Sequence, residues 1–252
     1  STGATAIVAS ALADGQTLTT TGAGGLTVTG LSGDMTSTST GTVAVTMEDD
    51  AGTVSATLTT TNSGGTTVGT GTFDSNDTLI LAGGNTIAVT VADTTSITTG
   101  AAAASVAVAS TKIATVNAAA MADGVVLTTS GAGQTVITGL KADLTDTSTV
   151  AQDITVAAVA TITLGLGTNT TGTDDVTATA LTDGQVLTMT GANNATVAFA
   201  NGDLTASAYT GALVVTGTGT TGQFTTGTAS SSISSTGATA IVASALADGQ
   251  TL

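Results

Sequence analysis

The chain lacks the side chains on which most enzyme active sites depend. Its 252 residues include no Cys, His, Arg, Pro or Trp, and only one Tyr and three Phe. Without His and Cys there is no imidazole base, no thiolate nucleophile and no soft metal ligand. Without Arg there is no bidentate clamp for phosphate or carboxylate groups. The composition excludes most catalytic chemistries, and we predict that the protein is not an enzyme.

Positive charge is equally scarce. Two Lys stand against 17 Asp and Glu, which gives a formal net charge of −15. A surface of this sign repels phosphate groups, so we expect no nucleic-acid partner. No run approaches 18 consecutive apolar residues, and the first residues lack the charged and then apolar pattern of a signal peptide. The sequence therefore predicts no membrane insertion in this segment.

Three small residue types dominate what remains. The chain holds 63 Thr, 44 Ala and 33 Gly, and its 41 % of hydrophobic residues are mostly Ala and Val. Thr and Val favour strands over helices. Small apolar side chains cannot fill a wide globular core, but they can fill a thin layer between two sheets about 10 Å apart. We therefore expect an all-β fold.

A long exact repeat organises the chain. Residues 1–18, STGATAIVASALADGQTL, recur letter for letter as residues 235–252. Identity over such a length indicates a tandem array. We predict that residues 1–234 form one complete repeat unit and that residues 235–252 begin the next, identical one.

A weaker repeat lies inside this unit. The string ALADGQTLTTTGAGGLTVTGLSGDMT at 11–36 returns with substitutions at 120–145 and 180–205, and a degenerate copy begins at Phe73. The unit is therefore predicted to contain four diverged modules, at about 1–61, 62–109, 110–169 and 170–234.

Aligned columns of the modules predict the core and the turns. Large apolar residues separated by Thr alternate with period two, as expected for strands with one buried face. The predicted core consists of Leu12, Leu18, Val28, Phe73, Leu79, Val89, Met121, Leu127, Ile137, Leu181, Leu187 and Val197. Glycines between the predicted strands serve tight reversals or positive φ angles. These are Gly15, Gly22, Gly83, Gly124, Gly131, Gly184 and Gly191.

Two all-β architectures fit this pattern. Modules this short are small for sandwich domains of about 100 residues. Stacked coils of about 20 residues fit them better, so we predict a repetitive β-solenoid. Tandem antiparallel β-sandwich modules are the alternative, because TLTTT-GAGG-LTVTG is typical of a hairpin with a four-residue loop. The Ala clusters at 101–104 and 118–120 are the only helix candidates.

Acidic residues gather in short clusters that could bind calcium, which takes six to eight oxygen ligands. The candidates are Glu48, Asp49, Asp50, Asp74, Asp77, Asp143, Asp146, Asp174 and Asp175. The sequence contains neither an EF-hand loop nor Gly-Asp nonapeptides. The other interpretation is that these carboxylates keep loops solvated. Ca²⁺ is the only cofactor that the sequence suggests.

The strings ADGQTLTTTGAGGLTVTG, ADGVVLTTSGAGQTVITG and TDGQVLTMTGANNATVAF lie in an acidic, Thr-rich and Cys-free chain. In this the chain resembles giant tandem-repeat surface proteins of bacteria, which include biofilm adhesins and filament-forming β-repeat proteins. The resemblance implies an extracellular or cell-surface location, a structural or adhesive role, and cell-surface glycans as a further partner. The chain departs from the calcium-dependent members in lacking their nonapeptides.

These observations lead to two functional hypotheses. The first is an extracellular structural protein that self-assembles into a fibre, sheath or surface layer, with other copies of itself as partners through repeat-to-repeat and lateral contacts. The second is a rigid spacer stalk of a large cell-surface adhesin.

Overall fold

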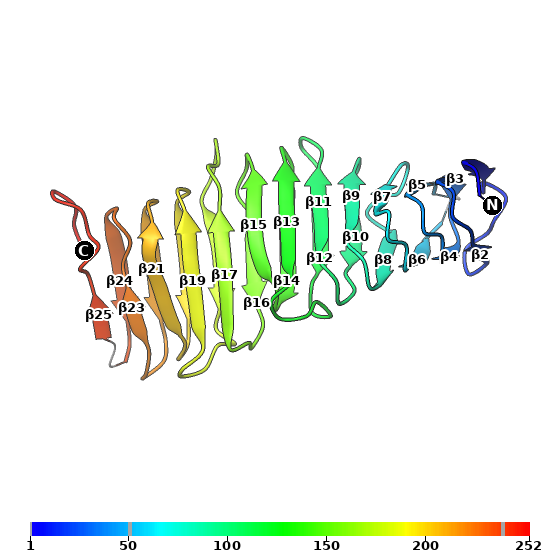
Figure 1. Cartoon of the computed structure of the whole chain (residues 1–252). Helices are drawn as coiled ribbons and strands as arrows, with labels where there is room; N and C mark the ends of the chain where they lie inside the picture. Colours follow the sequence, from blue (N-terminus) through cyan, green and yellow to red (C-terminus); the bar gives the residue numbers. More distant parts are fainter. Residues whose placement is uncertain (1, 50–51, 238–239) are drawn as a thin grey trace. The chain divides into compact units, whose positions relative to one another are not determined.

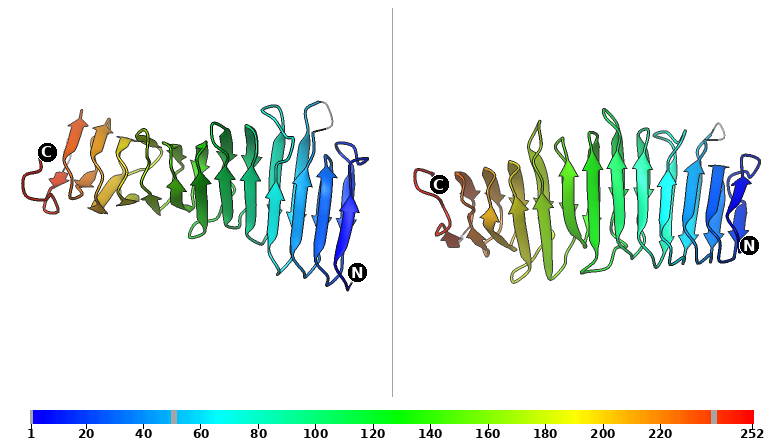
Figure 2. Two further views of the ribbon diagram at one scale, coloured as in Figure 1. Left: turned by 90° about the horizontal axis from the view of Figure 1, so that it is seen from above. Right: turned by 45° about the horizontal axis from the view of Figure 1, so that its top comes forward.

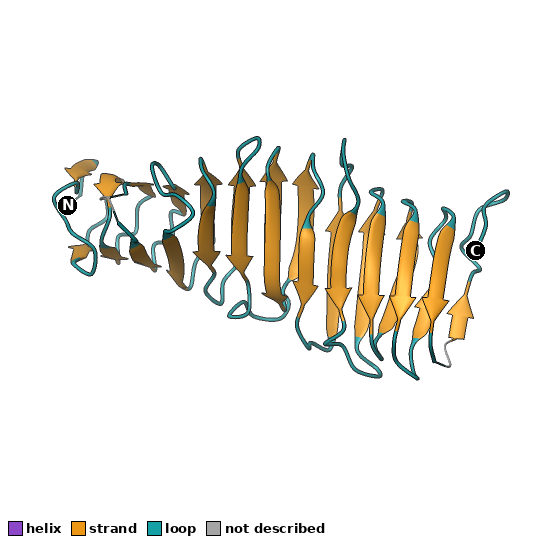
Figure 3. Ribbon diagram, turned by 180° about the vertical axis from the view of Figure 1, so that it is seen from behind, coloured by secondary structure: helices purple, strands orange, loops and turns teal. Residues whose placement is uncertain are grey.

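The computed structural model describes residues 2–49, 52–237 and 240–252. These residues form strands joined by loops and contain no helix (Figure 3). The strands are parallel and stack as a β-solenoid of about 12 turns. The predicted solenoid is confirmed. The antiparallel sandwich is wrong, because neighbouring strands in both sheets are parallel. The helix candidates are also wrong, because residues 101–103 and 118–120 lie in loops and Ala104 begins β11.

Within the described residues, no helix has the length and apolarity needed to cross a bilayer.

The chain divides into two compact units. The first comprises residues 1–122 and 130–135, and the second comprises residues 123–129 and 136–252. Residues of β13 (Val126–Gly131) and β14 (Gln134–Leu140) belong to both units.

In the first unit, successive strands alternate between two parallel sheets, so that each turn of the solenoid contributes one strand to each sheet (Figure 1). The odd-numbered strands are β1 (Thr5–Val8), β3 (Leu26–Leu31), β5 (Val43–Met47), β7 (Thr66–Gly69), β9 (Ile87–Val91) and β11 (Ala104–Val108). The even-numbered strands are β2 (Thr17–Thr20), β4 (Asp34–Ser37), β6 (Ser55–Thr60), β8 (Thr78–Gly83), β10 (Thr95–Thr98) and β12 (Ile113–Asn117).

The second unit repeats this arrangement, and strands that follow one another within a sheet lie side by side (Figure 2). Its odd-numbered strands are β15 (Asp143–Ser148), β17 (Thr161–Leu166), β19 (Val186–Gly191), β21 (Asp203–Tyr209), β23 (Gln223–Thr225) and β25 (Ala240–Val242). Its even-numbered strands are β16 (Asp153–Val156), β18 (Asp174–Ala178), β20 (Ala195–Phe199), β22 (Leu213–Gly217) and β24 (Ser231–Ser235).

Ladders of buried side chains run through each unit. Alternate residues of every strand point inward, and parallel pairing aligns them from one coil to the next. In the first unit the central ladder of the odd-numbered sheet consists of Ile7, Val28, Val45, Val68, Val89 and Val106. In the second unit the corresponding ladder consists of the buried residues Ile162, Leu187, Leu204 and Phe224 and ends at Ile241, which is exposed. Most of these side chains are β-branched or Leu, which keeps the interior narrow.

Aromatic rings join the two sheets of the second unit. The rings of Phe199 on β20 and Phe224 on β23 lie 5.6 Å apart between centroids. Both side chains are buried. This contact fixes an even-numbered strand against an odd-numbered one.

The predicted core residues differ in burial according to the coil they occupy. Ten of the twelve are buried, and their exposure does not exceed 2 %. Leu12 and Leu18 are only partly buried. Both belong to the first coil, which has a neighbouring coil on one side only.

The predicted turn glycines all have positive φ. The sequence had placed all of these glycines between strands. Three of them are instead the last residues of strands: Gly83, Gly131 and Gly191. At Gly191 the φ is 112°, and a Cβ would lie 1.7 Å from the carbonyl oxygen of Leu166. Close approach of neighbouring coils requires glycine at this position.

Candidate functional site

One face of the first unit carries no charged side chain. The outward-facing residues of its odd-numbered sheet form two rows along the paired strands. The first row is Ala6, Thr27, Ala44, Thr67, Ala88 and Ser105, and the second is Val8, Thr29, Thr46, Gly69, Thr90 and Ala107. We call these twelve residues the Ala/Thr face. It is built almost entirely of small side chains.

The Ala/Thr face is unusual in a chain with a net charge of −15. Among the described residues of the first unit, Asp34 is the only acidic residue within a strand, and it lies on the even-numbered sheet. The other acidic side chains lie in loops. Negative charge is therefore kept out of the strand positions of this face, although the Glu48 carboxylate, in the loop after β5, reaches Gly30 at the end of β3.

A shallow hollow of about 480 Å³ lies on the Ala/Thr face. Its lining includes Ala44, Thr67 and Ala88 of the first row. The lining residues are Ala, Gly, Thr and Val, so the hollow offers methyl groups, hydroxyls and backbone to a partner and no charge. Such a surface suits close packing against another small-residue face.

The structure separates most of the acidic residues that neighbour one another in the sequence. Asp143 and Asp175 point outward, whereas Asp146 on β15 and Asp174 on β18 are buried. Strand geometry explains this, because an odd offset along a strand places side chains on opposite faces. Glu48 and Asp49 follow β5, and Asp50 lies outside the described residues.

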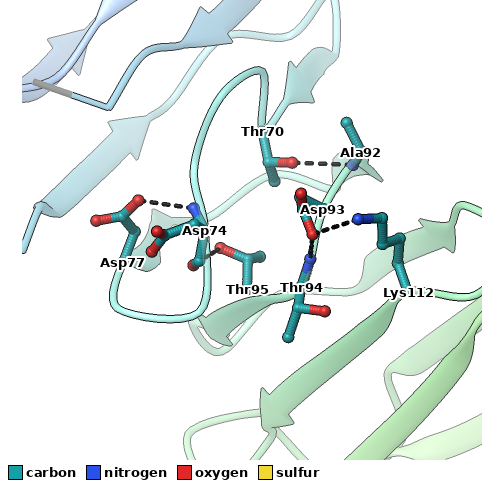
Figure 4. A network of polar contacts seen from close by, with 8 residues as sticks. All are labelled: Thr70, Asp74, Asp77, Ala92, Asp93, Thr94, Thr95 and Lys112. Atoms are coloured by element: carbon teal, nitrogen blue, oxygen red, sulfur yellow. Dashed lines mark hydrogen bonds and ion pairs between the residues drawn. The ribbon is translucent and has the colours of Figure 1, made fainter. Parts of the chain in front are cut away.

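Asp74 and Asp77 come together in the loop that precedes β8 (Figure 4). The Asp77 carboxylate accepts hydrogen bonds from the backbone N–H of Asp74 at 2.8 Å and from that of Val54 at 2.9 Å. The Asp74 carboxylate accepts the N–H of Asn76 at 2.7 Å. These carboxylates therefore hold the loop in place through backbone donors.

The same region contains an ion pair between coils. Lys112 Nζ lies 2.7 Å from Asp93 Oδ1, which also accepts the N–H of Thr94 (Figure 4). The hydrogen bond from Lys112 holds the pKa of Asp93 below its ordinary value, and the Thr94 N–H adds to the effect. Because both side chains are partly exposed, the pair contributes little to stability.

A buried polar cluster lies inside the second unit. Asp146 Oδ1 accepts hydrogen bonds from the Thr129 hydroxyl at 2.7 Å and from the N–H and hydroxyl of Ser148. Its other carboxylate oxygen, Oδ2, is buried and has no hydrogen-bond partner among the described residues. One side of this carboxylate is thus well satisfied and the other is not.

Asp174 is the second carboxylate of the buried cluster. It accepts hydrogen bonds from the N–H of Gln152 and from the side-chain amides of Asn169 and Asn193. Burial raises the pKa of Asp174, these three hydrogen bonds oppose the rise, and the nearby Asp146 charge adds to it. Tyr209 extends the cluster by donating its phenolic hydrogen to the carbonyl of Asn193.

The calcium hypothesis gains no support from this geometry. Within the described residues, no three or more acidic side chains are grouped so as to hold a metal ion. The carboxylates described above accept hydrogen bonds from backbone, amide and hydroxyl donors. Calcium binding stays a prediction.

Carboxylates that join neighbouring coils were not expected from the sequence, which had suggested Asp143 only as a calcium ligand. Asp34, Asp143 and Asp203 each begin a strand, and each Oδ1 accepts a backbone N–H of the following coil at 2.7 Å. The donors are Thr57, Thr163 and Gln223. The three Asp occupy one column of the module repeat, and this recurrence is the signal that could have identified them.

Comparison with protein-family models, with curated proteins and with solved structures gave no match.

Proposed function

We propose that this chain is an extracellular structural repeat protein that assembles with copies of itself into a fibre, sheath or surface layer. The observation that carries the proposal is the Ala/Thr face. In water, a strongly acidic chain repels its own copies. An uncharged face of small side chains removes that repulsion locally and allows two copies to approach closely.

The packing chemistry of the face supports lateral association. Stacked sheets pack about 10 Å apart when their facing side chains interdigitate. Ala and Thr alternate along the first row, so methyl groups and hydroxyls of one copy can fit between those of another. The scarcity of catalytic side chains agrees with a role in which the surface itself is the functional element.

The test compares the same substitution on two faces. Thr67 lies on the Ala/Thr face, and Thr115 lies on β12 of the other sheet; both are exposed. We expect the native chain to form laterally associated assemblies in light scattering and electron micrographs. Thr67→Glu should abolish lateral association, and Thr115→Glu should leave it intact.

The spacer stalk is the second hypothesis, and the solenoid architecture is compatible with it. A native chain that stays monomeric at all concentrations would favour the stalk over the fibre. Equal loss of association in both variants would mean that net charge, and not the Ala/Thr face, controls assembly.

A further inference from the structure

Two oxygen atoms in the buried polar cluster of the second unit have no hydrogen-bond partner among the described residues. They are Asp146 Oδ2 and Asn169 Oδ1, and both atoms are buried. The Asp146 residue as a whole is only 2 % exposed. Both atoms are acceptors, so neither can satisfy the other. A buried acceptor that meets neither a donor nor a cation costs free energy, and a charged one costs more.

The backbone brings these two atoms to one corner of the solenoid. Asp146 pairs with Leu166 of the next coil. Further along the two coils, the Thr149 carbonyl accepts the Thr170 N–H at 2.9 Å. Asn169 therefore lies in a corner that rests directly against the corner following Asp146.

Asp174 connects the two open oxygens. Asn169 Nδ2 donates to Asp174 Oδ1 at 2.9 Å, and this bond leaves the amide oxygen of Asn169 for another partner. Burial raises the pKa of Asp174, and the Asp146 charge adds to the rise. The two carboxylates therefore lie close enough in the interior to act on each other.

Positive side chains do not balance these carboxylates. The chain contains two Lys and neither Arg nor His. Among the described residues the only ion pair joins Lys112 to Asp93, and Lys141 is exposed. The hydrogen bonds to Asp146 and Asp174 come from neutral hydroxyl, amide and backbone donors. The buried negative charge is thus without a side-chain counter-ion, which makes a cation from solution a favourable partner.

We propose that this corner binds a monovalent metal cation, Na⁺ or K⁺, through Asp146 Oδ2 and Asn169 Oδ1. The carboxylate oxygen supplies the negative charge and the amide oxygen supplies a neutral ligand. Ca²⁺ takes six to eight oxygen ligands, usually from several carboxylates. Here Asp146 Oδ1 and both oxygens of Asp174 already accept hydrogen bonds. A single open carboxylate oxygen therefore matches an ion of single charge.

The site joins two neighbouring coils of the second unit. Asp146 lies on β15, and Asn169 lies in the loop between β17 and β18. A bound ion holds these two coils together from the inside, so the stability of the unit depends on the ions of the solution. A buried water molecule is the other candidate occupant, since it can donate to both oxygens. Stability would then not depend on the cation.

The test measures the thermal unfolding midpoint of the full chain while NaCl or KCl replaces tetramethylammonium chloride. Constant ionic strength removes the general effect of salt on an acidic chain. Tetramethylammonium is too large for a corner between adjacent coils. We expect the midpoint of the native chain to rise by a few degrees with Na⁺ or K⁺, because the ion binds the folded state only. The ion that gives the larger rise is the preferred ligand.

Two variants separate the site from the charge of the chain. Asp146→Asn removes the open carboxylate oxygen and should lose the rise. Asp175→Asn is the matched control, because it removes the same charge from the outer face of β18 and should keep the rise in full. The site is wrong if the native midpoint does not respond to Na⁺ or K⁺, or if Asp146→Asn responds as the native chain does. A rise with CaCl₂ alone would overturn the assignment of a monovalent ion.

A second measurement needs no variant and keeps the proposal testable if Asp146→Asn does not fold. NMR relaxation of the preferred ion, sodium or potassium, should be faster in the presence of the native chain. An excess of tetramethylammonium displaces ions held loosely around an acidic surface, but it should not displace an ion in the corner. Faster relaxation that tetramethylammonium abolishes completely would contradict a buried site.

Discussion

The Asp143 carboxylate accepts a hydrogen bond from the backbone N–H of Thr163, and this bond of 2.7 Å joins one coil of the second unit to the next. The Asp143 N–H itself donates to the carbonyl of Val125 on the coil before. Asp143 is therefore tied to both of its neighbours, and the same arrangement recurs at Asp34 and Asp203.

This relationship predicts the effect of removing the carboxylate. Asp143→Ala should lower the free energy of unfolding by about 1–3 kcal/mol, because a partly buried N–H loses a charged acceptor. Asp183→Ala, in an exposed turn, is the matched control and should change stability by less than about 0.5 kcal/mol. Urea denaturation followed by circular dichroism measures both. Equal effects would show that Asp143 acts only through its charge.

The buried cluster predicts an unusual dependence of stability on pH. Because burial raises the pKa of Asp174 in the folded state, that state holds the proton more tightly than the unfolded state. In the unfolded state the pKa of Asp174 is about 3.9. The contribution of Asp174 to the free energy of unfolding therefore falls as the pH rises from this value through the higher pKa of the folded state, and it is constant at higher pH.

Asp174→Asn should remove this contribution. The difference in free energy of unfolding between the native chain and the variant is expected to change with pH across that window and to be flat at higher pH. Denaturation midpoints measured from pH 4 to 8 test this. A difference that does not vary with pH would show that Asp174 does not titrate differently in the two states.

The close approach of coils at Gly191 predicts a site-specific cost for an added methyl group. Gly184 and Gly191 both have positive φ, so alanine at either position meets backbone strain of about 1–2 kcal/mol. Only at Gly191 would the Cβ also clash with the Leu166 carbonyl, since space at Gly184 is open. Gly191→Ala should therefore lower the thermal midpoint clearly more than Gly184→Ala. Similar midpoints would contradict the close approach.

Thr111 is the only non-glycine residue with positive φ among the described residues, at 65°. A β-branched residue is strained in this region. Thr111→Gly should raise the free energy of unfolding by about 0.5–1 kcal/mol, since relief of strain exceeds the added freedom of the unfolded chain. Thr115→Gly, within β12, serves as the control and should destabilise the protein.

The fold class could be predicted because small β-forming residues and the exact repeat leave few alternatives. Individual strands were harder to locate. The chain forms β16 and β17 with a turn between them that the sequence does not signal. That turn has the sequence Ala157-Ala158-Val159-Ala160, which contains no Gly, Asn, Asp or Pro to signal it.

Strands with polar inward residues are hard to locate from the sequence for a related reason. β4 has the sequence DMTS, and its inward residues are Met35 and Ser37. A narrow interior accepts Ser and Thr, so burial does not produce the apolar alternation on which strand prediction depends.

The buried carboxylates could not be predicted, because the sequence does not say which of two adjacent residues points inward. Asp174 and Asp175 look equivalent in the sequence, but only Asp174 enters the interior. The sequence also does not show which of the two sheets a module residue joins. Leu79 lies on the even-numbered β8, whereas Leu127, which occupies the same column of the module alignment, lies on the odd-numbered β13.

The direction of the backbone hydrogen bonds gives each unit a particular response to force. Bonds between successive coils run from strand to strand along the stack, so tension in that direction acts on the two strand pairs, one in each sheet, that join one coil to the next. A released coil of about 20 residues can extend to about 70 Å. Each unit should therefore extend under load in small, repeated steps as single coils unfold, and it should shorten again by refolding when the load is removed.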